Sequence, residues 1–99
     1  MLTLELTASN AALLEAHGRS VEIAYKRVGD LHYLTIYEPE TRLILYAPLV
    51  AMRDLALIVG GQSALIRPAR IRAGRLRVAV EASRAVSISR IDRPAAMTA

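Results

Sequence analysis

Four arginines near the middle of the second half of the chain have the clearest chemistry. Arg70 and Arg72 precede the dipeptide Ala73-Gly74, and Arg75 and Arg77 follow it. If Ala73-Gly74 forms a two-residue turn between antiparallel strands, Arg72 lies opposite Arg75. Arg70 then lies opposite Arg77, and all four side chains share one face because strand faces alternate. Since guanidinium groups make bidentate, charge-assisted bonds to phosphate, this pattern predicts an anion-binding surface.

Repulsion among these four arginines would be destabilising, and it could be relieved in two ways. Like charges directly opposite each other on a strand ladder are destabilising, at a scale of about 0.2 to 1 kcal/mol per pair. Phosphates of a nucleic acid would offset that repulsion. Alternatively, the arginines extend into solvent or pair with acidic side chains of a partner protein. The sequence leaves both explanations open.

The net charge is divided unevenly between the two halves of the chain. Residues 1–51 hold four basic and six acidic side chains, a net charge of −2. Residues 52–99 hold nine arginines and three acidic side chains, a net charge of +6. A concentrated positive charge favours binding to polyanions, so the second half is the predicted contact region.

Composition excludes several classes of protein. The 99 residues are 54% hydrophobic and include no cysteine, which argues against disorder, a disulfide scaffold and a thiolate metal site. The apolar stretch from Leu43 to Ile66 contains Pro48, Arg53 and Asp54, so a membrane span is not expected. No targeting signal is recognisable, and we expect a cytoplasmic protein. The surplus of apolar residues in so small a chain predicts a homo-oligomer.

Catalytic chemistry has little support. His17 and His32 are the only imidazole bases, and neither belongs to a spacing typical of a metal site. Glu38 and Glu40 flank Pro39 in a predicted turn, where solvated carboxylates are ordinary. We therefore predict a non-enzymatic protein without catalytic residues, metal ligands or a cofactor.

The elements that would position the arginines are mostly strands. Alternation predicts a strand at 2–6, a hairpin within 21–37 that turns at Gly29-Asp30, and a strand at 43–46. A cap at Ser9 or Asn10 and a closing Gly18 predict a short helix at 10–17. Residues 48–59 fit a helix or a strand, and Pro48 at a first helical position favours the helix. Further strands are expected at 63–67, 69–72, 75–81 and 85–91.

These elements predict a mainly β fold with one or two short helices, in which antiparallel hairpins form a small barrel or sandwich. Residues 1–93 would be one domain and 94–99 a flexible tail. Aligning the halves suggests an internal repeat of 18–46 and 61–89. In that alignment Gly18 matches Gly61, and Gly29 matches Gly74.

The segment from 75 to 92, RLRVAVEASRAVSISRID, resembles the later strands of the carbon storage regulator family of bacterial RNA-binding translational regulators. Gly61-Gln62-Ser63 resembles that family's early turn, so the likeness covers residues 61–92. The resemblance implies a strand-exchanged homodimer of five-stranded chains that binds GGA-containing loops in messenger RNA leaders. Arg90 would hold the principal RNA contact, with Val86 and Ile88 on the edge strand that meets the bases.

The chain departs from that family's pattern at several positions. Ser83 stands where the family has a turn proline, and Ser89 stands where it has a histidine. The family's basic pair on its first strand has no match near 56–58, and Ala47 occupies the position in the first half that corresponds to Arg90. The first half would then be a copy that keeps the scaffold without the contact.

Two functions follow as hypotheses. The first is an RNA-binding module, of the translational regulator type, that contacts single-stranded or hairpin RNA through Arg70, Arg72, Arg75, Arg77 and Arg90. The second is a homo-oligomeric protein-interaction module in which these arginines pair with acidic groups of a partner.

Overall fold

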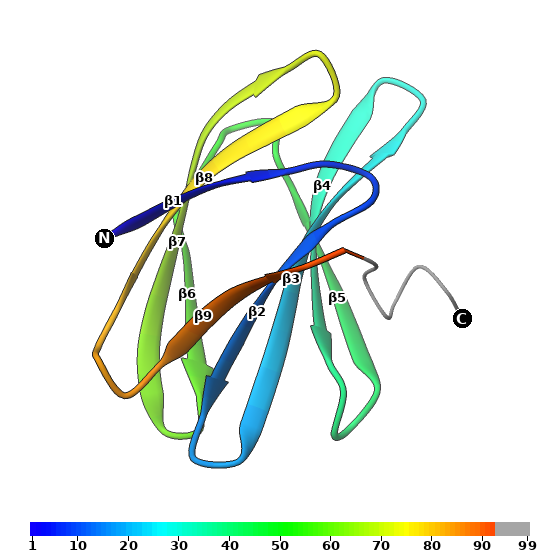
Figure 1. Cartoon of the computed structure of the whole chain (residues 1–99). Coiled ribbons are helices and arrows are strands. Elements are labelled where there is room, and N and C mark those ends of the chain that lie inside the picture. The colour runs from blue at the N-terminus through cyan, green and yellow to red at the C-terminus, as the bar shows by residue number, and fades with distance from the viewer. Residues whose placement is uncertain (93–99) are drawn as a thin grey trace.

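Nine strands form the regular structure of residues 1–92, the part of the chain that the computed structural model describes (Figure 1). Within these residues no helix is present, and so none could cross a membrane. In chain order the strands are β1 (Leu2–Leu6), β2 (Ala11–Ala16), β3 (Arg19–Val28), β4 (Leu31–Glu38), β5 (Leu43–Pro48), β6 (Leu55–Val59), β7 (Gln62–Arg72), β8 (Arg75–Ala82) and β9 (Ser87–Ile91).

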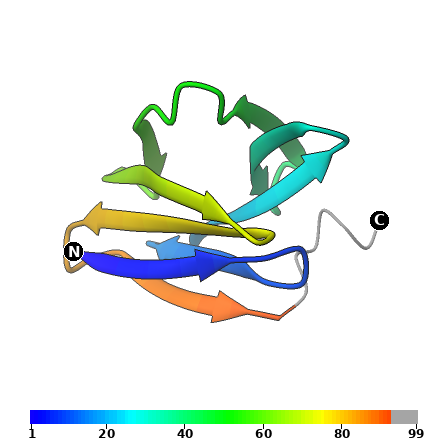
Figure 2. The same cartoon turned by 90° about the horizontal axis from the view of Figure 1, so that it is seen from above.

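The strands pair into two antiparallel sheets that pack as a sandwich. One sheet has the order β1-β8-β7-β6 and the other the order β5-β4-β3-β2-β9. The first and last strands each join the sheet formed by the other half of the chain. β1 pairs with β8, and β9 pairs with β2. Figure 2 shows the two layers from above. The predicted β fold is confirmed as an open sandwich, and the sheets do not close into a barrel.

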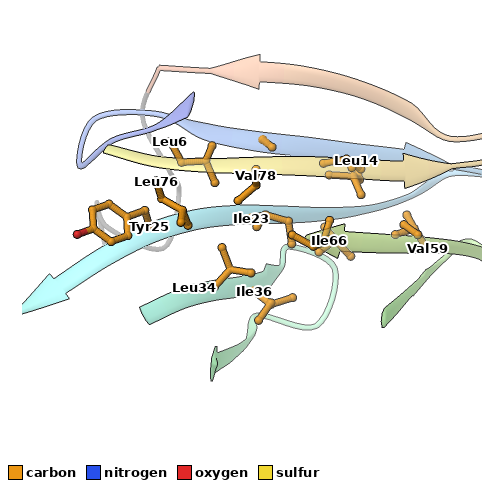
Figure 3. Packing of buried hydrophobic residues seen from close by; sticks show 14 of the residues in the cluster. Leu6, Leu14, Ile23, Tyr25, Leu34, Ile36, Val59, Ile66, Leu76 and Val78 are labelled. Carbon is orange, nitrogen blue, oxygen red and sulfur yellow. The ribbon is translucent and has the colours of Figure 1, made fainter. Parts of the chain in front are cut away.

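Alternating residues of both sheets fill the space between the layers. Leu6, Leu76 and Val78 project from one sheet, and Leu14 and Ile23 from the other, each at most 1% exposed. Figure 3 shows these side chains meeting between the ribbons. Since strand faces alternate, most polar and charged residues between them face solvent, whereas Glu22 on β3 and Thr35 on β4 are buried.

The predicted helix at 10–17 is wrong, because these residues form β2. Two neighbours, β3 and β9, hydrogen-bond to its two edges, and Ala12 and Leu14 are fully buried. Asn10 caps no helix; its Oδ1 accepts a hydrogen bond from the Thr7 amide at 2.7 Å, which closes the β1–β2 turn. Tertiary pairing thus outweighs the helix propensity of the alanine-rich segment.

The helix favoured for 48–59 is also wrong, and the strand alternative is correct for its second part. Pro48 ends β5, and Leu55–Val59 form β6 against β7. Gly60 and Gly61 follow with φ of 54° and 78°, the left-handed pair of a type I′ hairpin turn. Gly60 and Gly61 therefore connect two strands and do not mark the end of a helix.

The strands predicted at 63–67 and 69–72 are parts of one strand, β7, interrupted by a bulge between Pro68 and Arg70. The strand predicted from residue 85 begins at Ser87, because the Val86 amide donates to the Ser83 carbonyl in a turn. The predicted tail at 94–99 lies outside the described residues.

The two proposed repeats place their matched glycines at equivalent turns. Gly18 and Gly61 lie in the turns that begin β3 and β7, while Gly29 and Gly74 lie in the turns that end these strands. All four have positive φ. Shared turn chemistry does not by itself establish a duplication, so the repeat stays a prediction.

Gly60 joins the two sheets at one end of the sandwich. A Cβ atom on this residue would overlap the carbonyl group of Ala16, whereas a Cβ on Gly61 would meet nothing within 4 Å. The turn between β6 and β7 therefore packs backbone to backbone on the end of β2.

Gly60→Ala is expected to lower the free energy of unfolding by about 3 kcal/mol or more, since it adds this overlap to the strain of a left-handed φ. Gly61→Ala, the matched control, has the φ strain alone and should cost about 1 to 2 kcal/mol. Urea unfolding measures both values. Equal costs for the two variants would contradict the close approach.

Candidate anion-binding surface

The turn that presents the arginines has the predicted geometry. Ala73 and Gly74 have φ of 52° and 74°, a type I′ pair between β7 and β8. Arg72 pairs with Arg75 across the ladder. Arg70 likewise pairs with Arg77, and all four side chains are exposed. The predicted register and shared face are confirmed.

The bulge in β7 brings Arg70 to this face. Ile66 and Pro68 are buried on the inner side of the sheet, so strict alternation would direct residue 70 inward as well. The extra residue at Ala69 shifts the alternation by one position. Arg70 therefore turns outward beside Arg77, and Ile71 packs against the core instead.

A carboxylate from the other end of the chain lies among the arginines. Glu5 on β1 stands opposite Arg77 in the ladder. Its two oxygens lie 3.7 Å from Arg75 Nη1 and 3.5 Å from Arg77 Nη2. Sequence reasoning missed Glu5, because its partner is 72 residues away and no local pattern predicts that β1 joins β8.

Together these side chains line a cleft of about 250 Å³, which we call the arginine surface; its residues are Glu5, Arg70, Arg72, Ala73, Arg75 and Arg77. Four guanidinium groups and one carboxylate give it a formal charge of +3. Arg70 and Arg72 have no carboxylate partner within residues 1–92. Two arginines are thus available to an external anion.

The next arginine along the same face is neutralised. Arg67 lies 3.3 Å from Asp54 and 3.5 Å from Glu81. Two carboxylates therefore pair with Arg67, whereas Arg70 and Arg72, nearer the Ala73-Gly74 turn, have no carboxylate partner within residues 1–92.

Arg90, the fifth predicted contact, lies outside this cleft. It is exposed on β9, in the other sheet, opposite Ala12. Val86 is only 7% exposed and belongs to the core, so the base contact implied for it is not available. Ile88 is partly buried against the core as well. The structure brings four of the predicted arginines together and places the fifth apart.

Each of the two histidines contacts a neighbouring side chain of the fold. The ring of His32 stacks on Tyr25 with centroids 5.8 Å apart, and its Nδ1 is hydrogen-bonded to the Tyr25 hydroxyl. His17 Nε2 lies 3.5 Å from the Gln62 amide nitrogen. Within residues 1–92, no three His, Cys, Asp or Glu side chains are grouped so as to hold a metal ion.

A second, larger cleft of about 490 Å³ lies at the start of β3. Arg19, Ser20 and Glu38 contribute to its lining. Arg19 Nη2 donates to Glu38 at 2.9 Å. Glu40 accepts hydrogen bonds from the Ser20 amide and hydroxyl. The hydrogen bond that the Ser20 backbone N–H donates to the carboxylate is the main cause that lowers the pKa of Glu40. The cations and anions of this cleft pair with one another.

Comparison of the chain with protein-family models, with curated proteins and with solved structures finds no match.

Glu5→Gln is expected to lower stability by about 0.2 to 1 kcal/mol at low ionic strength, because the arginines then repel without a counter-charge. The loss should shrink in about 1 M salt, where the Debye length falls to about 3 Å. Thermal unfolding at both salt concentrations measures it. Glu15→Gln, with the same change of charge at an exposed residue of β2, is the control and should show no such salt dependence.

Glu40 is expected to make the fold sensitive to acid. A carboxyl whose pKa is lowered on folding stabilises the protein above its unfolded pKa, and this contribution is lost as the pH falls through the folded pKa. Wild type should therefore lose more stability than Glu40→Gln between about pH 6 and pH 3. Parallel losses in the two proteins would contradict the role of the Ser20–Glu40 bonds.

Proposed function

We propose that this protein is a non-enzymatic RNA-binding module whose arginine surface contacts the phosphates of single-stranded or hairpin RNA. The observation that carries the proposal is the concentration of four guanidinium groups around one carboxylate on an exposed face. Arg70 and Arg72 remain without an internal counter-charge in the described part of the chain. Phosphate groups match both the charge and the fork geometry of arginine.

The rigid backbone beneath the arginines supports this function. Leu76 and Val78 anchor the hairpin in the core and are fully buried. The charged side chains therefore start from fixed positions, and less conformational freedom is lost when an anion binds. The four arginines of this surface are exposed and so are accessible to a strand of RNA.

The resemblance to the carbon storage regulator family supports RNA as the polyanion and translational regulation in the cytoplasm as the setting. That resemblance implies strand exchange, and an exchange of β1 and β9 between the halves is present within this single chain. Arg90, exposed on the exchanged strand β9, would then contact bases separately from the phosphate contacts of the arginine surface.

Arg70→Ala/Arg72→Ala is expected to weaken RNA binding about tenfold, roughly 1.4 kcal/mol. Each lost phosphate contact should also reduce the salt slope of binding to single strands by about 0.7. Fluorescence anisotropy with a labelled hairpin RNA, at several salt concentrations, measures both quantities. Arg42→Ala/Arg84→Ala removes the same charge from exposed positions off the surface and serves as the control.

Wild-type affinity in the double variant, or no binding by wild type at micromolar concentrations in low salt, would overturn the proposal. Arg90→Ala separates the second contact. If this residue reads bases, the variant should lose preference for a GGA-containing hairpin over a scrambled one while it keeps the salt slope of the remaining contacts.

A protein-interaction module is the second candidate, and Glu5 is the observation that favours it. This carboxylate already binds Arg75 and Arg77, so the surface accommodates acidic side chains. In that case the same double variant would lose an acidic protein partner, and wild type would bind no RNA.

A further inference from the structure

The four sheet edges of the sandwich are protected unequally. Exposed edges offer unpaired backbone groups, and natural proteins shield them with charges, prolines or bulges. Among these edge strands β1 carries Glu5, β9 carries Arg90, and β5 ends at Pro48, which has no N–H group. In contrast, β6 reads LALIV and has no such residue. It is the one apolar, unguarded edge within residues 1–92.

The backbone groups at this edge can be assigned from the β6–β7 register. Val59 and Gln62 flank a two-residue turn and form a hydrogen-bonded pair. Because such pairs alternate along an antiparallel ladder, Leu57 also bonds to β7. The N–H and C=O groups of Ala56 and Ile58 therefore point away from β7, toward the free edge.

Exposed apolar side chains occur on β6 and also on β5, which is an edge strand of the facing sheet. Exposed large hydrophobic residues on β5, β6 and their connection are Leu43 (52%), Leu45 (52%), Tyr46 (54%), Val50 (85%) and Ile58 (67%). Leu45 pairs with the buried Ile36, so it belongs to the inner side of its sheet. Leu45 is half-exposed because it lies on the edge strand of the five-stranded sheet, and the facing sheet has only four strands to cover it.

We propose that a second copy of this chain binds here, with its β6 antiparallel to the first and the two-fold axis at Leu57. Ala56 then lies opposite the partner's Ile58, and these two residues exchange the hydrogen bonds that both edges leave unmade. Leu57 meets the partner's Leu57 in the close, non-hydrogen-bonded pair between them. The partner strand also extends the four-stranded sheet over Leu43 and Leu45, which a five-residue edge needs to approach the roughly 800 Å² per partner of a standard interface.

The charges at the ends of β6 agree with this register. Asp54 falls opposite the partner's Gly60, and Arg53 falls opposite the partner's Gly61, so no like charges meet across the axis. Gly61 lines the same cleft as Glu38. Each Arg53, which has no ion-pair partner within residues 1–92, thus approaches a carboxylate-bearing cleft of the other copy.

Pairing through β6 would place two arginine surfaces on one face of a continuous sheet. Their hairpins would lie about four strand spacings apart across the sheet, roughly 19 Å, and would point toward opposite ends of the strands because the two-fold axis reverses strand direction. Each pair of arginines lies about six residues along β8 from the level of the axis, which adds roughly 40 Å of separation along the strands. This consequence rests on the proposed function, since it makes the dimer a bivalent RNA binder. The pairing itself does not depend on RNA.

Sedimentation equilibrium without RNA tests the pairing. At about 100 μM, wild type is expected at twice the 10.8 kDa chain mass. Ile58→Lys places a charge at the edge and should sediment as a folded monomer, with its fold checked by circular dichroism. Val28→Lys, a matched change at a 53% exposed residue away from β6, should stay dimeric. A monomeric wild type, or a dimeric Ile58→Lys, would overturn the proposal.

A cysteine at the axis locates the interface directly, because the chain has no native cysteine. A non-hydrogen-bonded pair brings Cα atoms to about 4.5 Å, within the range of a disulfide. Leu57→Cys should form a covalent dimer on mild oxidation, and Val28→Cys should not. Absence of the Leu57→Cys product in a dimeric protein would overturn this register. Either failure leaves the RNA-binding result of Arg70→Ala/Arg72→Ala unaffected.

Discussion

The pairing of the first strand with the eighth is the constraint on which the rest of the structure depends. It buries Leu6 against Leu76 and brings the two ends of the chain into one core. Its counterpart, the pairing of β9 with β2, exchanges a late strand into the other sheet. Neither sheet is built from consecutive strands alone, so the two halves of the chain are held together as a unit.

This same pairing sets the electrostatics of the candidate site. Without β1, four arginines would face one another with no counter-charge; with it, Glu5 contacts two of them. Two arginines of the surface are therefore paired within the chain, and Arg70 and Arg72 have no carboxylate partner within residues 1–92. Arg67, in contrast, is paired with Asp54 and Glu81.

The sandwich is also asymmetric in a way that bears on assembly. On one side β9 covers the edge of β2, whereas nothing in the described chain covers the edge of β6. On β6 itself Ile58 is 67% exposed. The arginine surface and the edge of β6 thus lie on different parts of one sheet, so the proposed RNA contact and the proposed pairing of two copies would use separate surfaces.

The sequence by itself determined the local features. Alternation identified most strands, and Ala73-Gly74 located the hairpin that aligns the arginines, because turn chemistry and side-chain period act over a few residues. Only the tertiary structure decided that Ala11–Ala16 form a strand, that a bulge turns Arg70 outward, and that Glu5 joins the site. Each of these depends on a partner strand distant in sequence, whose hydrogen bonds and burial outweigh local propensity. For the same reason the separation of Arg90 from the other arginines was decided by the exchange of β9 between the sheets.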